Sequence, residues 1–363
     1  MLSYFRWVLF FVVLLVTLMG GALWVGNQLL TASGPLTATK NIVIPRGAGP
    51  QTMAKVLKEE GVIDHERLFR VAVMIDPTPK PIKAGEYEVP AHISMLGVLE
   101  LLQSGKQVQR RLTVVEGMTT AEVIDLVKNT PALTGEITLD LKEGDLLPET
   151  YFYSRDDTRD GLLMRMKEAM DKTLDEAWRK RAAGLPLASR LQALTLASIV
   201  EKETAIPAER AKVAAVYINR LRRRMKLESD PTTIYGITQG KVTFNRELTR
   251  ADLASNSPYN TYVVGGLPPG PICNPGRAAI LAATNPARDR ALWFVADGQG
   301  GHAFSTTLAE HNRNVERWRQ IQRERAEQQL LQQQQQQQSQ TPSAAPGAPS
   351  LPPPGQQRPA PRP

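Results

Sequence analysis

The hydrophobic pattern opens with a long apolar run. Residues 7–25, WVLFFVVLLVTLMGGALWV, contain no charged side chain. A helix of this length rises about 28 Å, close to the roughly 30 Å thickness of a bilayer's hydrocarbon core. Trp7 and Trp24 lie near its two ends, where amphipathic aromatic rings prefer the membrane interface. The pattern therefore predicts a transmembrane helix over 7–25.

Charges around this helix predict its orientation. Arg6 precedes it, whereas the next basic residue is Lys40. The positive-inside rule then leaves residues 1–6 in the cytoplasm and places the rest of the chain outside, after a linker over 26–40. A cleaved signal peptide is the alternative. A signal peptide needs a basic segment before its apolar run, and here that segment contains only Arg6. LTAS at 30–33 is also a poor cleavage site, so a retained anchor is favoured.

A pattern of extended apolar run followed by amphipathic helix then recurs. It appears at 41–63, 85–106 and 112–131. Ser94 is the expected cap of the second helix, and Thr119 or Thr120 that of the third. The predicted helix after Ser94 places four apolar residues on one face: Met95, Val98, Leu99 and Leu102. We predict a small α+β module over 41–142 that resembles the glycan-binding LysM fold; a spacer without a ligand is the alternative.

Helical periodicity dominates from residue 143 onward. It predicts helices over 160–184, 189–204 and 208–225. A Pro-, Gly- and Asn-rich region that includes SDPTTIYG and residues 255–276 is expected to form long loops, which in compact domains are often binding surfaces. RAAILAATNP then predicts a helix, and ALWFVAD with GQGGHAFS predicts a β-hairpin before a last helix. The fold class is α+β, with a mixed α/β catalytic domain over 143–325 whose helices surround an acidic residue.

The C-terminal 326–363 segment is rich in Gln and Pro. Such a composition buries too little apolar surface to offset the entropy of ordering the chain. We therefore predict a disordered tail.

Charge and residue counts narrow the function classes. The net charge is +8, but the one dense basic cluster is accompanied by no nucleic-acid motif and is interpreted as a solvated helix face: Arg220, Arg222, Arg223, Arg224 and Lys226. The single cysteine, Cys273, cannot form an internal disulfide or a cysteine zinc site. The four histidines match no zinc spacing: His65, His92, His302 and His311. The chain also contains no G-x-S-x-G, H-E-x-x-H or P-loop motif, so no metal or organic cofactor is expected.

Two glutamates interrupt the apolar helix LTLASIVEKETA, residues 194–205. On a helical wheel Thr195, Ser198 and Lys202 form the only polar arc, and both Glu201 and Glu203 point away from it. The two acids are about 160° apart, so they cannot act on the same bond. Burial raises a carboxyl pKa, as a general acid requires, but a buried glutamate can equally be a structural partner of an arginine. Periodicity does not choose between the two acids.

Sugars bind by stacking on aromatic rings and by polar contacts. Residues near the predicted acidic helix that suit such contacts are Tyr217, Asn219, Asp230, Tyr235, Tyr259, Asn260 and Tyr262, with Glu203 as a further candidate. Each residue taken singly is more often structural than ligand-binding.

Several motifs in order resemble the YceG-like endolytic murein transglycosylases. They are GEYEVP, VVEGMT, EGDLLPETY, LASIVEKET, VYINRL, SDPTTIYG, PYNTY, GLPPGPICNPG and LWFVADGQGGHAFS. The resemblance covers roughly residues 1–325 and leaves out the Gln/Pro-rich tail. It implies a bacterial inner-membrane protein, in contact with membrane lipid, whose periplasmic part cleaves the MurNAc–GlcNAc bond of nascent peptidoglycan strands.

The resemblance also implies a mechanism and a catalyst. It points to Glu201 as the single acid/base, with the MurNAc 6-hydroxyl as internal nucleophile and a 1,6-anhydroMurNAc end as product. Glu203 is then a structural neighbour, for which Arg210 and Arg220 are candidate partners. Such cleavage would limit strand elongation and bring the protein near peptidoglycan synthases. The alternative is a non-catalytic peptidoglycan-binding scaffold of the elongation machinery.

Overall fold

The computed structural model describes residues 2–76 and 80–340. It divides into two compact units, Met1–Asp289 and Arg290–Pro363. Helices predominate in both, and the three sheets of the described residues are antiparallel strand pairs. The α+β class is therefore confirmed, whereas the part predicted as mixed α/β contains no parallel sheet in the residues described.

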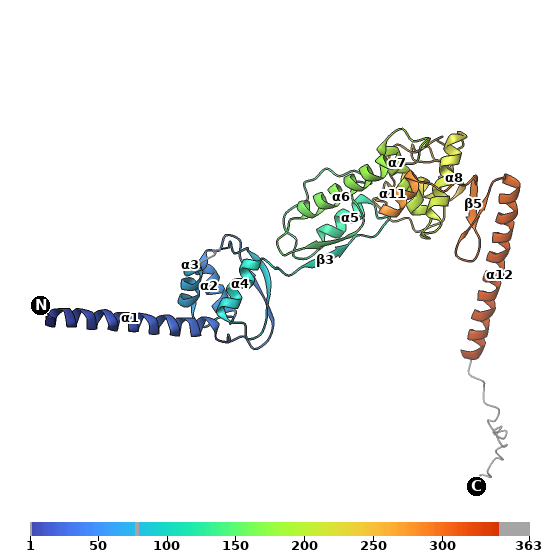
Figure 1. The fold of residues 1–363 in the computed structure, drawn as a ribbon. Coiled ribbons are helices and arrows are strands. Elements are labelled where there is room, and N and C mark those ends of the chain that lie inside the picture. Colours follow the sequence, from blue (N-terminus) through green and yellow to red (C-terminus); the bar gives the residue numbers. More distant parts are fainter. Residues whose placement is uncertain (1, 77–79, 341–363) are drawn as a thin grey trace, which may run out of the picture. The chain divides into compact units, whose positions relative to one another are not determined.

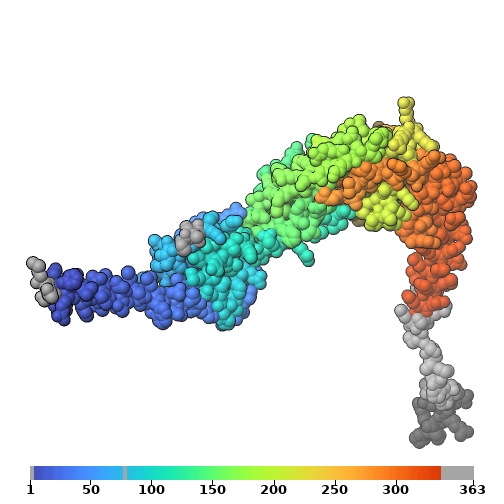
Figure 2. All heavy atoms as spheres, in the orientation of Figure 1, coloured from blue at the N-terminus to red at the C-terminus, as the bar shows by residue number. Residues whose placement is uncertain are grey.

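The N-terminal helix α1 spans Leu2–Thr31. Its apolar side chains are exposed along most of its length. Figure 2 shows the helix in dark blue, uncovered by other parts of the chain on the face in view. Tyr4–Thr31 is long and apolar enough to cross a membrane. The helix extends past the predicted end at residue 25 because its last turn packs against the following module, where Leu30 is buried.

The first module contains β1 (Lys40–Ile44), α2 (Pro50–Glu59), α3 (Glu66–Ile75), β2 (Gly85–Val89) and α4 (Met95–Ser104). Strands β1 and β2 pair antiparallel, and they bury Ile42, Ile44, Tyr87 and Val89 against the helices. Ser94 caps α4 as predicted, because its Oγ accepts a hydrogen bond from the Gly97 N–H at 3.2 Å. Helix α3 was not predicted.

The third repeat belongs to a different core. Strand β3 (Arg110–Thr113) pairs antiparallel with β4 (Thr150–Tyr153), and α5 (Thr120–Lys128) begins with a Thr119–Glu122 capping box. Its buried residues Val123 and Val127 share a core with Leu146, Leu162 and Met166, not with the first two repeats. The structure therefore divides the predicted module over 41–142 between two cores. The three repeats have the same apolar periodicity, so the pattern alone did not separate them.

Helix α7 (Arg190–Glu203) is the central helix of the part that follows (Figure 1). It packs against α6 (Arg159–Arg179), α8 (Arg210–Arg222), α9 (Asp230–Thr238) and α11 (Arg277–Thr284), and residues 193–200 are all buried. Of the polar arc of the helical wheel, Thr195 and Ser198 are therefore buried, whereas Lys202 is exposed. Ser198 is fully buried, and its Oγ accepts a 3.0 Å hydrogen bond from the Ile272 N–H.

Two further predictions in this region are corrected. SDPTTIYG was grouped with turn-rich sequence, but it forms most of α9, with a proline in the first turn where the missing N–H costs nothing. Arg220 was assigned to a solvated basic face, but it is buried and donates to the carbonyls of Lys226 and Leu227. The other members of that cluster are exposed. A short helix, α10 (Arg250–Leu253), precedes the long loop.

The second unit contains the predicted hairpin. Strands β5 (Trp293–Ala296) and β6 (His302–Ser305) pair antiparallel and are followed by α12 (Leu308–Gln340). The helix continues well beyond residue 326, where the disordered tail was predicted to begin. Glutamine has a high helix propensity, which is consistent with this continuation. The remainder of the predicted tail, 341–363, lies outside the described residues.

Candidate active site

Glu201 lies in the last turn of α7, with its side chain only 4% exposed. Its Oε2 accepts a 2.8 Å hydrogen bond from the backbone N–H of Gly276. Gly276 is the N-cap residue of α11, so the carboxylate lies at the positive end of that helix. This contact orients the carboxyl group and leaves Oε1 directed to other partners.

Arg210, at the start of α8, lies between two carboxylates. Its Nη2 is 3.5 Å from Oε1 of Glu201 and 3.2 Å from Oε2 of Glu116. The Arg210 side chain is 12% exposed, whereas that of Glu116 is 44% exposed. Arg210 was a candidate partner of Glu203, but the structure places it beside Glu201.

The electrostatics of the site favour a protonated Glu201. Burial is the largest effect and raises the pKa of Glu201 above its ordinary value. The Gly276 N–H lowers this pKa, the nearby Glu116 carboxylate raises it, and Arg210 lowers it again. The net shift is upward, so the carboxyl group keeps its proton at higher pH than an exposed glutamate does, as a general acid requires.

A buried asparagine brings the parts of this site together. Asn274 is fully buried and accepts the Leu146 N–H at 2.9 Å through its side chain. The same side chain donates to the Met118 carbonyl at 3.0 Å, and the Asn274 carbonyl accepts the Gly117 N–H at 3.0 Å. These bonds join the VVEGMT and GPICNPG motifs beside α7. Glu116, Asn274 and Gly276 were not singled out from the sequence; the motif quotations included all three without assigning them roles.

A pocket of about 350 Å³ is lined by Lys202, the residue that follows Glu201 in α7, but not by Glu201 itself. Its lining residues come from α5, α7, α9 and the loops after α9: Thr119, Glu122, Lys202, Pro231, Ile234, Tyr235, Thr238, Gly240, Val242, Thr243, Phe244 and Ile272. Tyr235 is the only sequence-predicted sugar contact among them. Near this pocket Glu143 accepts the Thr120 N–H at 2.8 Å, and burial raises its pKa. The pocket combines aromatic, apolar and charged side chains, as a sugar-binding groove requires.

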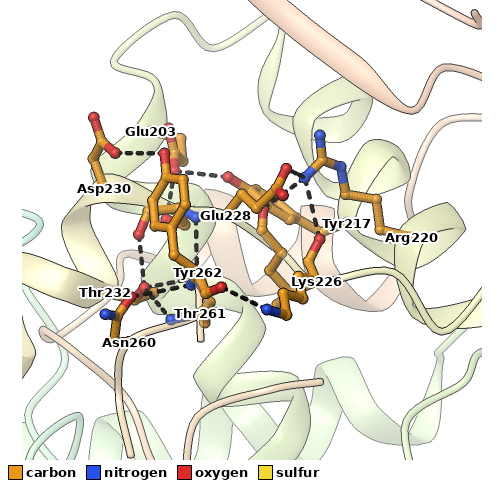
Figure 3. A network of polar contacts seen from close by, with 12 residues as sticks. Glu203, Tyr217, Arg220, Lys226, Glu228, Asp230, Thr232, Asn260, Thr261 and Tyr262 are labelled. Atoms are coloured by element: carbon orange, nitrogen blue, oxygen red, sulfur yellow. Dashed lines mark hydrogen bonds and ion pairs between the residues drawn. The ribbon is translucent and has the colours of Figure 1, made fainter. Parts of the chain in front are cut away.

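Glu203 belongs to a different network, shown in Figure 3. Its Oε1 accepts hydrogen bonds from the Tyr217 hydroxyl at 2.7 Å and from the Ser229 hydroxyl at 2.5 Å. In the same network the Tyr262 hydroxyl donates to Asp230 at 2.7 Å. The two glutamates of VEKET therefore have different partners, as their angular separation on the helix predicts.

Three other predicted contacts are engaged within the protein. The Asn219 side chain donates to the Asp289 carbonyl at 2.9 Å. Asn260 is fully buried, and its amide donates to the Leu253 and Ser255 carbonyls. The ring centroids of Tyr259 and Tyr235 are 4.8 Å apart. Substrate contact by the eight candidates remains a prediction.

We also looked for a metal-binding cluster and for a reactive thiol among the described residues. No group of three or more His, Cys, Asp or Glu side chains among them is placed to hold a metal ion. Cys273 is buried, its thiol donates to the Ser198 carbonyl, and burial raises its pKa well above the ordinary value. The thiolate that nucleophilic cysteine chemistry needs is disfavoured there.

The comparison with known families now decides the family. The model of the YceG-like family matches residues 42–317, which include every residue of this site. The chain belongs to the YceG-like family. A relative from Bacillus subtilis (strain 168), named endolytic murein transglycosylase, is 29% identical over 333 residues, which cover 83% of this YceG-like chain and 91% of the relative.

Two further proteins match this chain. An endolytic murein transglycosylase of Streptococcus pneumoniae serotype 2 (strain D39 / NCTC 7466) is 29% identical over 358 residues, covering 85% of this chain but 64% of that longer protein. The crystal structure of a putative yceG-like protein from Listeria monocytogenes is 28% identical, with a TM-score of 0.47; the match covers 76% of this chain and 98% of that one.

Proposed function

We propose that this YceG-like protein is a lytic transglycosylase that cleaves the MurNAc–GlcNAc bond within nascent peptidoglycan strands. The observation that carries the proposal is the environment of Glu201: a nearly buried carboxyl group whose pKa is raised and which the Gly276 N–H orients. Lys202, the next residue of the helix, lines a pocket of about 350 Å³. The names of the YceG-like relatives support the same activity.

The proposed reaction needs one carboxyl group. Protonated Glu201 donates its proton to the glycosidic oxygen, and the C1–O bond to the GlcNAc leaving group breaks. The 6-hydroxyl of the same MurNAc attacks C1, and the Glu201 carboxylate takes the proton of that hydroxyl. The products are a free GlcNAc hydroxyl and a 1,6-anhydroMurNAc end, and Glu201 regains its proton. No water is consumed.

One observation favours a second candidate, hydrolysis with two carboxylates. Glu116 and Glu201 contact the same Arg210 nitrogen, so the two acids lie close together. Retaining glycosidases place an acid and a nucleophile at short separation. Their products differ from those of a transglycosylase because water is added to the cleaved end.

The decisive experiment is mass spectrometry of strands digested by the full-length protein. Transglycosylation yields anhydro ends, which are one water lighter than hydrolytic reducing ends. Glu201→Gln is expected to abolish cleavage, while Glu116→Gln retains anhydro products at an altered rate. Reducing ends from the unaltered protein, lost in both variants, would instead establish hydrolysis.

The remaining parts of the proposal concern location. Helix α1 anchors the protein in the bacterial inner membrane, with the N-terminus cytoplasmic and the rest periplasmic, near peptidoglycan synthases. The β1–α2–α3–β2 order with antiparallel strands supports a LysM-like module that holds glycan near the site. A non-catalytic scaffold is the alternative. It requires that Glu201→Gln fully replace the unaltered protein in a deletion strain.

A further inference from the structure

Helix α3 presents an unusual outward face. Phe69 and Ala72 are buried, whereas five residues on the opposite side are exposed: Arg67, Arg70, Val71, Met74 and Ile75. These five residues are called the α3 face below. Its three apolar side chains are 47%, 79% and 64% exposed, in chain order. Large apolar groups gathered on a helix face together with basic residues are typical of helices that lie at a membrane surface.

The C-terminal end of α3 lies beside the end of α1. Asn27 and Leu30 of α1 line one pocket, of about 520 Å³, together with Ala72 and Ile75 of α3 and residues of α4. Figure 1 shows α3 on the side of the module that adjoins α1. The apolar end of the α3 face is therefore close to the level of Asn27.

That level corresponds to the edge of the bilayer. Asn27 follows Trp7 by a helical rise of about 30 Å, the thickness of the hydrocarbon core. The polar headgroups extend roughly 5–7 Å further on each side. If Trp7 marks one edge of the core, Asn27 lies at the other, and Met74 and Ile75 are at headgroup depth.

The module is held against the end of α1. The helix continues without a break to Thr31, and Leu30 is buried in the core of the module. Just beyond the helix, the Ser33 hydroxyl donates to the His92 carbonyl at 3.3 Å. These contacts oppose rotation of the α3 face away from the bilayer.

We propose that the α3 face rests on an anionic phospholipid surface. Val71, Met74 and Ile75 enter the boundary between headgroups and acyl chains, and Arg67 and Arg70 pair with lipid phosphates. The corresponding outward positions of α2 include Lys55, Lys58 and Glu59, which favour water. The inference rests on the proposed membrane anchor and not on the proposed activity. It implies that the first module has a defined orientation on the membrane.

The test measures lipid proximity in the full-length protein, reconstituted in nanodiscs of phosphatidylcholine and phosphatidylglycerol. An environment-sensitive fluorophore is attached at Met74→Cys, at Lys55→Cys as the matched exposed control, and at Leu15→Cys within α1. Unaltered protein controls for labelling of Cys273, which is fully buried. Lipids carrying a nitroxide near the headgroup are expected to quench position 74 severalfold more than position 55.

Each outcome decides the proposal. Quenching at 74 no stronger than at 55, with position 15 in contact with lipid, overturns it while leaving the anchor intact. If the label at position 15 makes no contact with lipid, the anchor and the proposal are overturned together. Cross-linking between two copies at position 74 without quenching identifies a second copy as the occupant, and also overturns it.

A second measurement tests the basic part of the face. Quenching at position 74 is expected to weaken when phosphatidylglycerol is omitted, and also in an Arg67→Gln/Arg70→Gln double variant. Lys55→Gln/Lys58→Gln is the matched charge control and should have no effect. The preference for anionic lipid is overturned if quenching at position 74 is equal with and without phosphatidylglycerol and in both double variants. None of these measurements depends on glycan cleavage.

Discussion

The backbone N–H of Gly276 and the Oε2 of Glu201 are joined by a 2.8 Å hydrogen bond across 75 residues of sequence. Gly276 has an ordinary φ of −74°, so it is not needed for backbone freedom. A β-carbon at this position would lie 2.5 Å from Cδ of Glu116. Glycine therefore leaves the space that the Glu116 side chain occupies beside Glu201, and a larger residue would require that half-exposed side chain to move.

Gly276→Ala is expected to displace Glu116 and disturb the hydrogen bond to Glu201. A misplacement of about 1 Å near the reacting groups lowers the rate by roughly 100-fold. Gly265→Ala is the matched control, since its β-carbon meets nothing within 4 Å. Steady-state cleavage of purified strands measures both variants, and equal rates for the two would refute the steric argument.

Glu116 and Arg210 should shift the pH dependence in opposite directions. Glu116 raises the pKa of Glu201 and Arg210 lowers it. Because Glu201 must be protonated to donate, its pKa sets the alkaline limb of kcat/KM. Glu116→Gln is expected to move that limb to lower pH, and Arg210→Met to higher pH. Shifts in the same direction, or none, would contradict this electrostatic assignment.

Glu201 also makes the stability of the fold depend on pH. Its pKa is higher in the folded protein than in the unfolded chain, so its contribution to stability is full below the unfolded pKa. That contribution declines as pH rises through the folded pKa. Glu201→Gln removes the decline, so its Tm relative to the unaltered protein should increase from about pH 4 to about pH 8. If the Tm difference between the two proteins does not change with pH, burial of ionised Glu201 does not destabilise the fold.

Glu203→Gln is expected to affect folding more than chemistry. Glu203 accepts hydrogen bonds from Tyr217 and Ser229, and weakening such charge-assisted bonds costs about 1–3 kcal/mol. Thermal unfolding in detergent measures this loss, and cleavage below the Tm should persist. If Glu203→Gln is instead fully stable and inactive, Glu203 and not Glu201 is the catalyst.

Phe244 tests whether the pocket beside Lys202 binds glycan. Removing an aromatic stacking partner costs about 0.5–1.5 kcal/mol, so Phe244→Ala should raise KM roughly 2- to 10-fold with little change in kcat. Phe152→Ala is the matched control, because Phe152 is an exposed aromatic on β4 and is not among the lining residues of this pocket. A KM that rises equally in both variants would place the glycan elsewhere.

Local patterns predicted most of the elements. The uncharged run of α1, the apolar helix α7 and the hairpin of β5 and β6 follow from periodicities that repeat within a few residues. The same local patterns failed where packing decided the outcome. The repeat over 112–131 looks like the two before it, but its apolar face packs on α6. Ser198 belongs to the polar arc of α7, but it is fully buried and accepts a hydrogen bond from the Ile272 N–H.

The sequence by itself determined that Glu201 and Glu203 project from opposite sides of one helix, since two residues turn a helix by about 200°. The choice of Glu201 came from resemblance to the YceG-like family. Only the tertiary structure decided its environment: Gly276 and Glu116 reach it from segments 75 and 85 positions away along the chain, and Arg210 arrives on the next helix. The physical reason is that a pKa depends on burial and on charges within a few ångströms, and which segments come that close is set by packing, not by local periodicity.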